Sequence, residues 1–232
     1  MTERGMIFNA EMVRALLSDR KTQTRRIMKV QPESNQLGLL LITDSTKHSD
    51  IGKYHWAESN ATGNHVRSKL FSCPFGAVGD RIWVRETWSS DFANYYPNDR
   101  VWYAADNNRR LDIEVVDGVR GIYSPESDVH VPFRWQPSIH MPRWASRILL
   151  EITNVRVERL NAISEEDARA EGIIDGGCLN CGEPEPCGCA NPEPDATDAF
   201  AYLWQSIYGQ ENWNANPWVW VIEFKRVEGG AA

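Results

Sequence analysis

The sequence has no long hydrophobic run, and this absence limits the class of protein before any motif is considered. No apolar stretch approaches the roughly 18 residues that a membrane-spanning helix needs. The first residues, 1–5, do not begin an apolar core of the kind that a secretory signal peptide carries. These two absences predict a cytoplasmic protein that does not enter a membrane.

The chain also has fewer basic than acidic residues. The formal net charge of −7 argues against broad, sequence-independent binding to duplex nucleic acid. The charge is unevenly distributed, however. Residues 1–30 hold seven basic and three acidic residues, whereas residues 162–198 hold one basic and ten acidic residues. An acidic chain of this kind is therefore compatible with a local basic pocket.

Cysteine is scarce except in one short segment. Four of the five cysteines fall within twelve residues, and they are Cys178, Cys181, Cys187 and Cys189. A disulfide framework is not expected in a reducing cytoplasm. Three alternatives stay open, namely a structural zinc ion held by four thiolates, free or redox-active thiols, and an iron–sulfur cluster. Of these we favour zinc, and we expect no cofactor for catalysis.

Hydrophobic periodicity predicts many strands and a few short helices. Helices are expected at 10–18 after the N-cap Asn9, at 165–171 after the N-cap Ser164, and at 195–208. The predicted strands lie at 37–43, 81–88, 100–105, 111–116, 146–160 and 218–227. A β-bulge is expected near residues 153–154, where the alternation changes phase. This pattern predicts an α+β fold, built as a compact β-barrel decorated by short helices.

The densest group of cations and hydroxyls lies at residues 17–26, directly after the first predicted helix. It contains Lys21, Thr24, Arg25 and Arg26. Such a group suits an anionic or carbonyl-bearing ligand, although cations at a helix end also complement the helix dipole. If the segment is helical, Lys21 and Thr24 share a face. If it is extended, the two side chains point to opposite faces.

A second group of candidate binding residues comes from the strand at 81–88 and the proline-containing loop at 133–144. Arginine recognises phosphates, and aromatic side chains stack on nucleobases. Aromatic residues beside cations also serve in ordinary core and rim packing. The candidates are Arg85, Glu86, Trp88, His140, Arg143 and Trp144.

Taken together, these segments resemble the ASCH family, whose members are PUA-like barrels proposed to bind RNA. The chain is most similar to the larger members carried by phages and prophages. The resemblance rests on the motif Lys-Thr-Gln-Thr-Arg at 21–25 and on residues 79–86, 148–172 and 220–224. It implies a single PUA-like domain over 1–232, with a polar excursion at 34–70 and a cysteine-rich insertion at 176–194.

The resemblance also implies a set of catalytic residues. The small bacterial N4-acetylcytidine amidohydrolase of this family uses a lysine, a threonine and a glutamate. Its Lys-Thr-x-Thr motif matches Lys21 and Thr24, and the pattern around its glutamate matches residues 164–171, which places the third residue at Glu171. The chemistry is plausible, because a desolvated neutral lysine can take the proton of a threonine hydroxyl and so activate it.

Three functions remain open at this point. The first is an amidohydrolase that removes an acyl group from N4 of cytidine through Lys21, Thr24 and Glu171. The second is a non-catalytic module of phage origin that binds RNA or modified nucleotides. Both predict a nucleoside or single-stranded RNA as the ligand. The third is an accessory protein whose zinc-bound segment docks a partner.

Overall fold

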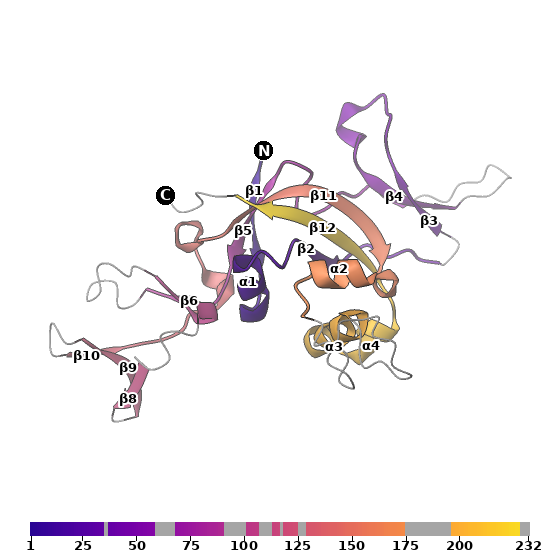
Figure 1. Ribbon diagram of the computed structural model, residues 1–232. Coiled ribbons are helices and arrows are strands. Elements are labelled where there is room, and N and C mark those ends of the chain that lie inside the picture. Colours follow the sequence, from indigo (N-terminus) through magenta and orange to yellow (C-terminus); the bar gives the residue numbers. More distant parts are fainter. Residues whose placement is uncertain are drawn as a thin grey trace, which may run out of the picture.

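The structure, a computed structural model, describes residues 1–34, 37–58, 68–90, 101–106, 113–116, 118–124, 129–174 and 196–227 (Figure 1). Its described part is α+β, as predicted, with several sheets and few helices. The central sheet has the strand order β1 (Glu3–Ile7), β5 (Arg81–Arg85), β11 (Leu149–Arg159), β12 (Trp218–Arg226) and β2 (Gln23–Ile27). Strands β1 and β5 are parallel, and the other neighbours are antiparallel.

The central sheet is an open arch, and the closed barrel expected from the sequence is not formed by the described residues. Its two outermost strands are β1 and β2. In place of a backbone ladder between them, the Arg26 side chain of β2 donates a 2.7 Å hydrogen bond to the carbonyl oxygen of Ile7. The same guanidinium lies over the ring of Phe8, 5.2 Å from its centroid. A side chain therefore occupies the gap where closure would need a strand pair.

The predicted helix caps are confirmed. Helix α1 (Ala10–Leu17) begins after Asn9, whose side chain accepts a hydrogen bond from the backbone N–H of Met12. Helix α2 (Glu165–Ala170) begins after Ser164, which accepts from the backbone of Asp167. Helices α3 (Ala196–Tyr208) and α4 (Gln210–Asn214) follow later in the chain. Figure 1 shows these helices on the concave side of the arch formed by β11 and β12.

Strand β12 is buried on both faces, and this divides the core into two clusters. Trp220 and Ile222 belong to the larger cluster, together with side chains of β1, α1, β5 and β11. Val221 belongs to the smaller cluster, together with Phe200 and Trp204 of α3. The predicted bulge is also confirmed, because the β11–β12 register shifts between Ile152 and Asn154.

The polar excursion contains an antiparallel hairpin of β3 (Leu37–Leu41) and β4 (Tyr54–Glu58), with the short helix η1 (His48–Asp50) between them. Strand β4 is anchored to the end of β12 by aromatic contacts. The rings of Trp56 and Trp218 are 5.2 Å apart, and those of Tyr54 and Trp220 are 5.1 Å apart. The hairpin is therefore attached to the core through its second strand.

The remaining elements lie between β5 and β12 in the sequence. Strand β6 (Trp88–Ser89) pairs with β7 (Trp102–Tyr103), and β8 (Ile113–Val116), β9 (Val119–Ser124) and β10 (Val129–Pro132) form a meander. The 3₁₀ helices are η2 (Ala104–Asp106), η4 (Ser138–His140), η5 (Arg143–Ala145) and η6 (Leu160–Ala162). None of the helices in the described ranges has the length and apolar character to span a bilayer.

Candidate functional site

Lys21 and Glu171 meet in a buried ion pair. The Lys21 Nζ donates to Glu171 Oε2 at 2.6 Å and to the backbone carbonyl of the same residue at 2.8 Å. The lysine side chain is 0% exposed and the glutamate side chain 3%. The two backbones also form an isolated antiparallel bridge. The segment after α1 is thus joined directly to the end of α2.

Gly172 makes this close approach possible. Its φ of +91° lies in the left-handed region, which glycine adopts without steric cost. A Cβ at this position would stand 2.7 Å from the Cβ of Ala15 and 3.1 Å from that of Lys21. The glycine that ends α2 therefore allows the helix to pack against α1, and so sets the position of Glu171.

Burial lowers the pKa of Lys21 below its usual value. Removing the ammonium group from water disfavours the charged form, and the nearby cations Arg26 and Arg25 act in the same direction. Glu171 opposes this shift through its charge and its hydrogen bond. The result is a lysine whose proton is held less tightly than that of an exposed one.

Arg25 is surrounded by carboxylates. Its Nη2 donates to Asp167 at 2.7 Å and to Glu158 at 3.1 Å, and its Nη1 lies 3.5 Å from Glu171 Oε1. Partial burial disfavours the charged form of Asp167, but Arg25 and Arg156 outweigh that effect and hold its pKa below the usual range. The Arg25 guanidinium therefore fixes the carboxylate of Glu171 from the side opposite Lys21.

Residues 23–27 form an extended strand. Of the two conformations that the sequence left open for this segment, helical and extended, the structure has the extended one. Thr24 pairs with Ile222 across the sheet, whereas Arg25 pairs with Val221, and these partners belong to different core clusters. Because successive side chains of a strand point to opposite faces, Thr24 lies on the face of β2 opposite to Arg25. The threonine thus does not share the face on which Arg25 approaches Glu171.

A small cavity nevertheless brings Thr24 and Glu171 together. Its volume is about 20 Å³, which is enough for about one water molecule. Three consecutive residues of β2, 24–26, line it together with Glu171 and the apolar face of α3. Residues from both faces of a strand can share a cavity only along its edge, and β2 is an edge strand of the sheet.

The backbone of Arg25 points toward that open edge. Hydrogen bonds from Phe224 N to Thr22 O and from Met28 N to Trp218 O show that the even-numbered residues of β2 pair with β12. Since bonding alternates along an antiparallel pair, the N–H and C=O of Arg25 face away from β12. An N–H donor thus lies beside Thr24 at the cavity.

A larger cleft adjoins the small cavity. It has a volume of about 460 Å³ and lies between α1 and α3, with residues 171–174 forming one wall. This size is in the range of roughly 300–1,000 Å³ that small-molecule sites occupy. Glu171 lines both the cleft and the small cavity, as do Met12 and Leu203. Glu171 is therefore the predicted catalytic residue that borders the space where a ligand fits.

The second group of predicted binding residues lies elsewhere, at the end of β5 and around η4 and η5. Glu86 is buried, and Arg147 binds both of its carboxylate oxygens at 3.0 Å. Burial raises the pKa of Glu86, with Arg147 acting against the shift. Trp88 is buried and meets Trp144 edge-on at 5.8 Å, whereas Trp144 is 63% exposed.

The other members of this group have structural contacts or lie in solvent. Arg85 donates to the carbonyl oxygen of Ile139 and lies over the ring of Trp83. Arg143 pairs with Glu3 at 2.9 Å, and His140 is exposed. None of the second group lines the cleft or the small cavity. The structure therefore divides the predicted binding residues, and only Arg25 and Arg26 lie with the predicted catalytic residues.

The four clustered cysteines lie outside the described residues, and so does the insertion at 176–194. The zinc prediction therefore stays a prediction. In the part of the chain that the structure describes, no three side chains of His, Cys, Asp or Glu gather as metal ligands would.

Sequence reasoning missed the carboxylates that hold Arg25 and the arginines of the cleft. Glu158 and Arg156 occupy alternate positions in β11, and two opposite charges on one face of a predicted strand were a usable signal. The cleft arginines, Arg14 and Arg20, had no such signal, because α3 is nearly two hundred residues away in the sequence.

No family model, curated protein or solved structure matches this chain.

Proposed function

We propose that the protein is an amidohydrolase that removes an acyl group from N4 of a cytidine. The observation that carries the proposal is the buried Lys21–Glu171 pair, at 2.6 Å, whose glutamate lines a cleft of about 460 Å³. In this proposal the cytosine occupies the cleft, and the acyl group points toward the small cavity at the edge of β2. Thr24 and Glu171 then lie on either side of the scissile amide.

The first step is attack by the Thr24 hydroxyl on the carbonyl carbon of the amide. The O–H bond breaks as the new C–O bond forms, and the proton passes to the Lys21–Glu171 pair. Glu171 is the member of the pair that lines the cavity, and its carboxylate accepts the proton while it stays hydrogen-bonded to Lys21. The backbone N–H of Arg25 stabilises the negative charge on the former carbonyl oxygen.

The second step breaks the bond between the carbonyl carbon and N4. The leaving amine takes the proton that the Lys21–Glu171 pair received, and cytidine departs. Water then hydrolyses the ester on Thr24, with the same pair moving its protons. The products are cytidine and a carboxylic acid, and the threonine is regenerated.

The test is an incubation of N4-acetylcytidine with the protein, followed by mass spectrometry. We expect conversion to cytidine by the wild type and by Lys29→Ala, which removes an exposed lysine near the site in sequence. Lys21→Ala is expected to lose the activity. Because Lys21 is buried and its loss can disturb folding, Thr24→Val serves as a second variant that keeps the shape of the side chain. A folded wild type without turnover would contradict the proposal.

A non-catalytic module for single-stranded RNA is the second candidate, and one observation favours it. Trp144 is 63% exposed, packs edge-on against the buried Trp88, and follows Arg143 in sequence. An exposed aromatic ring beside a cation is the arrangement on which nucleobases stack. This candidate predicts salt-dependent binding of RNA with no turnover.

A further inference from the structure

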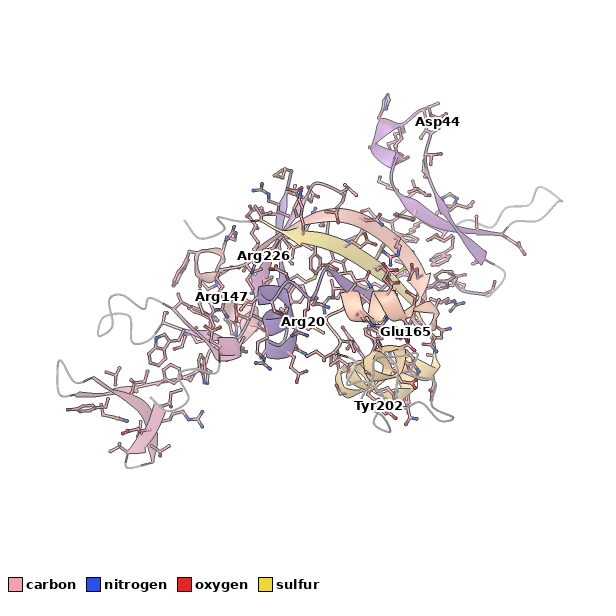
Figure 2. All side chains as sticks on the ribbon, viewed as in Figure 1. Arg20, Asp44, Arg147, Glu165, Tyr202 and Arg226 are labelled. Atoms are coloured by element: carbon pink, nitrogen blue, oxygen red, sulfur yellow. The ribbon has the colours of Figure 1, made fainter. Side chains whose placement is uncertain are left out.

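The cleft between α1 and α3 has one cationic rim and one apolar wall. Arg14 and Arg20 line it from the end of α1 and from the turn after it. Apolar side chains line it as well, and these include Met12, Ile173 and Leu203. Figure 2 places Arg20 in the space between α1 and α2. An apolar wall opposite two guanidinium groups suits a ligand with a flat base and an anionic group.

Neither arginine has a carboxylate partner among the described residues. Arg14 Nη1 donates to the carbonyl oxygen of Ala105 at 3.1 Å. Arg20 donates to the hydroxyl of Ser18 at 3.0 Å and to the carbonyl oxygen of Gly172 at 3.2 Å. These bonds to neutral acceptors orient the two guanidinium groups without neutralising them. Each arginine has five N–H donors, so donors remain for a ligand.

Acidic residues outnumber basic ones in this chain, so the lack of a carboxylate partner at Arg14 and Arg20 is informative. Arg25, Arg143 and Arg147 have carboxylate partners, whereas the two cleft arginines, like Arg26 and Arg85, have none in the described ranges. Glu11 and Glu171 also line the cleft and would repel an anion, but the carboxylate of Glu171 is paired with Lys21, which leaves Glu11 against two positive charges. Paired guanidinium groups bind phosphate oxygens through several parallel N–H donors.

We propose that the cleft binds a nucleotide, with its phosphate held between Arg14 and Arg20 and its base directed toward Glu171. This deepens the proposed function and rests on it for the identity of the base. The ligand is a cytidine carrying a phosphate, so a free nucleoside binds more weakly because it leaves both guanidinium groups unoccupied. The phosphate can belong to a mononucleotide or to the backbone of a short RNA.

Calorimetric titration of the full chain tests the proposal with three probes, namely cytidine, cytidine 5′-monophosphate and a cytidine tetranucleotide. We expect the monophosphate to bind at least about tenfold more tightly than the nucleoside, since hydrogen bonds between guanidinium groups and phosphate are charge-assisted and stronger than neutral ones. In Arg14→Gln/Arg20→Gln this preference should fall to about twofold or less. Arg120→Gln is the matched control, because it removes an exposed arginine outside the cleft. It should keep the full preference.

The three probes separate the sources of the phosphate. Tighter binding of the tetranucleotide than of the monophosphate would assign the cleft to RNA, and the reverse would assign it to free nucleotides. Equal affinities for cytidine and its monophosphate, or no binding of either, would overturn the proposal. So would an undiminished preference in the double variant.

The binding titration and the deacetylation assay can give different results, so the two proposals can fail independently. Phosphate-dependent binding by a protein that does not deacetylate N4-acetylcytidine leaves the cleft assignment intact and removes the reaction. Turnover of N4-acetylcytidine without any preference for a phosphate leaves the reaction intact and removes the cleft assignment.

Discussion

Lys21 Nζ and Glu171 Oε2 are 2.6 Å apart, although 150 residues separate them in the sequence. The two side chains differ in how many opposite charges they contact. Glu171 also lies 3.5 Å from Arg25, whereas among the described residues Glu171 provides the only carboxylate within ion-pair distance of Lys21. This difference predicts that removing Glu171 and removing Lys21 lower the free energy of unfolding by different amounts.

We expect Glu171→Gln to destabilise the fold more than Lys21→Met does. Removing one partner of a buried pair leaves an uncompensated charge and costs about 3–5 kcal/mol. Glu171→Gln leaves the Lys21 ammonium with neutral acceptors alone, while Lys21→Met leaves Glu171 beside Arg25. Urea denaturation at neutral pH measures the two free energies of unfolding. Equal losses, or a larger loss for Lys21→Met, would show that Arg25 does not compensate Glu171.

The lowered pKa of Lys21 predicts how stability depends on pH. Because burial holds the folded-state pKa below the usual 10.5, the unfolded chain binds more protons than the folded one between those two values. The free energy of unfolding therefore rises with pH in that window, and below it the contribution of Lys21 does not change with pH. The measurement is the difference between wild type and Lys21→Met in denaturant titrations from about pH 6 to about pH 10. A difference that falls as pH rises would contradict the assignment.

Gly172→Ala should loosen the contact that brings Glu171 to Lys21. The substitution meets a positive φ, and its new Cβ falls 2.7 Å from that of Ala15. Gly209→Ala is the matched control, since Gly209 has φ +87° and nothing within 4 Å of an added Cβ. In both variants we expect the positive φ to lower the free energy of unfolding by about 1–2 kcal/mol. A further decrease, caused by the close contact of the new Cβ, is expected only in Gly172→Ala. Thermal unfolding compares them, and equal losses would refute the close-packing argument.

Local features of this fold could be predicted from sequence because each depends on neighbouring residues. Asn9 and Ser164 are N-caps by residue type and position, and the bulge at 152–154 follows from a change of alternation. The resemblance in the Lys-Thr-x-Thr motif and at the end of α2 predicted that Lys21 and Glu171 lie together, and their side chains are in contact, while their catalytic role stays a prediction.

Features that depend on long-range packing could not be predicted from the sequence. The central sheet is open between its outermost strands β1 and β2, where Arg26 binds the carbonyl oxygen of Ile7, a contact that no local pattern encodes. Likewise, the candidate binding residues Trp88, Arg143 and Trp144 had the right chemistry for a ligand. Their distribution away from the cleft follows from how β6 and η5 pack.

The exposed ring of Trp144 provides the test of the RNA-binding candidate. If single-stranded RNA stacks there, Trp144→Ala should weaken its binding by about 1–3 kcal/mol per stacked base. The fold should keep its stability, because Trp144 is 63% exposed and the buried Trp88 is retained. Tyr202→Ala is the matched control, since Tyr202 is a similarly exposed aromatic residue on α3 (Figure 2). Fluorescence anisotropy with a labelled oligoribonucleotide at two salt concentrations measures both variants. Equal affinities for wild type and Trp144→Ala would exclude this surface as the place where single-stranded RNA stacks.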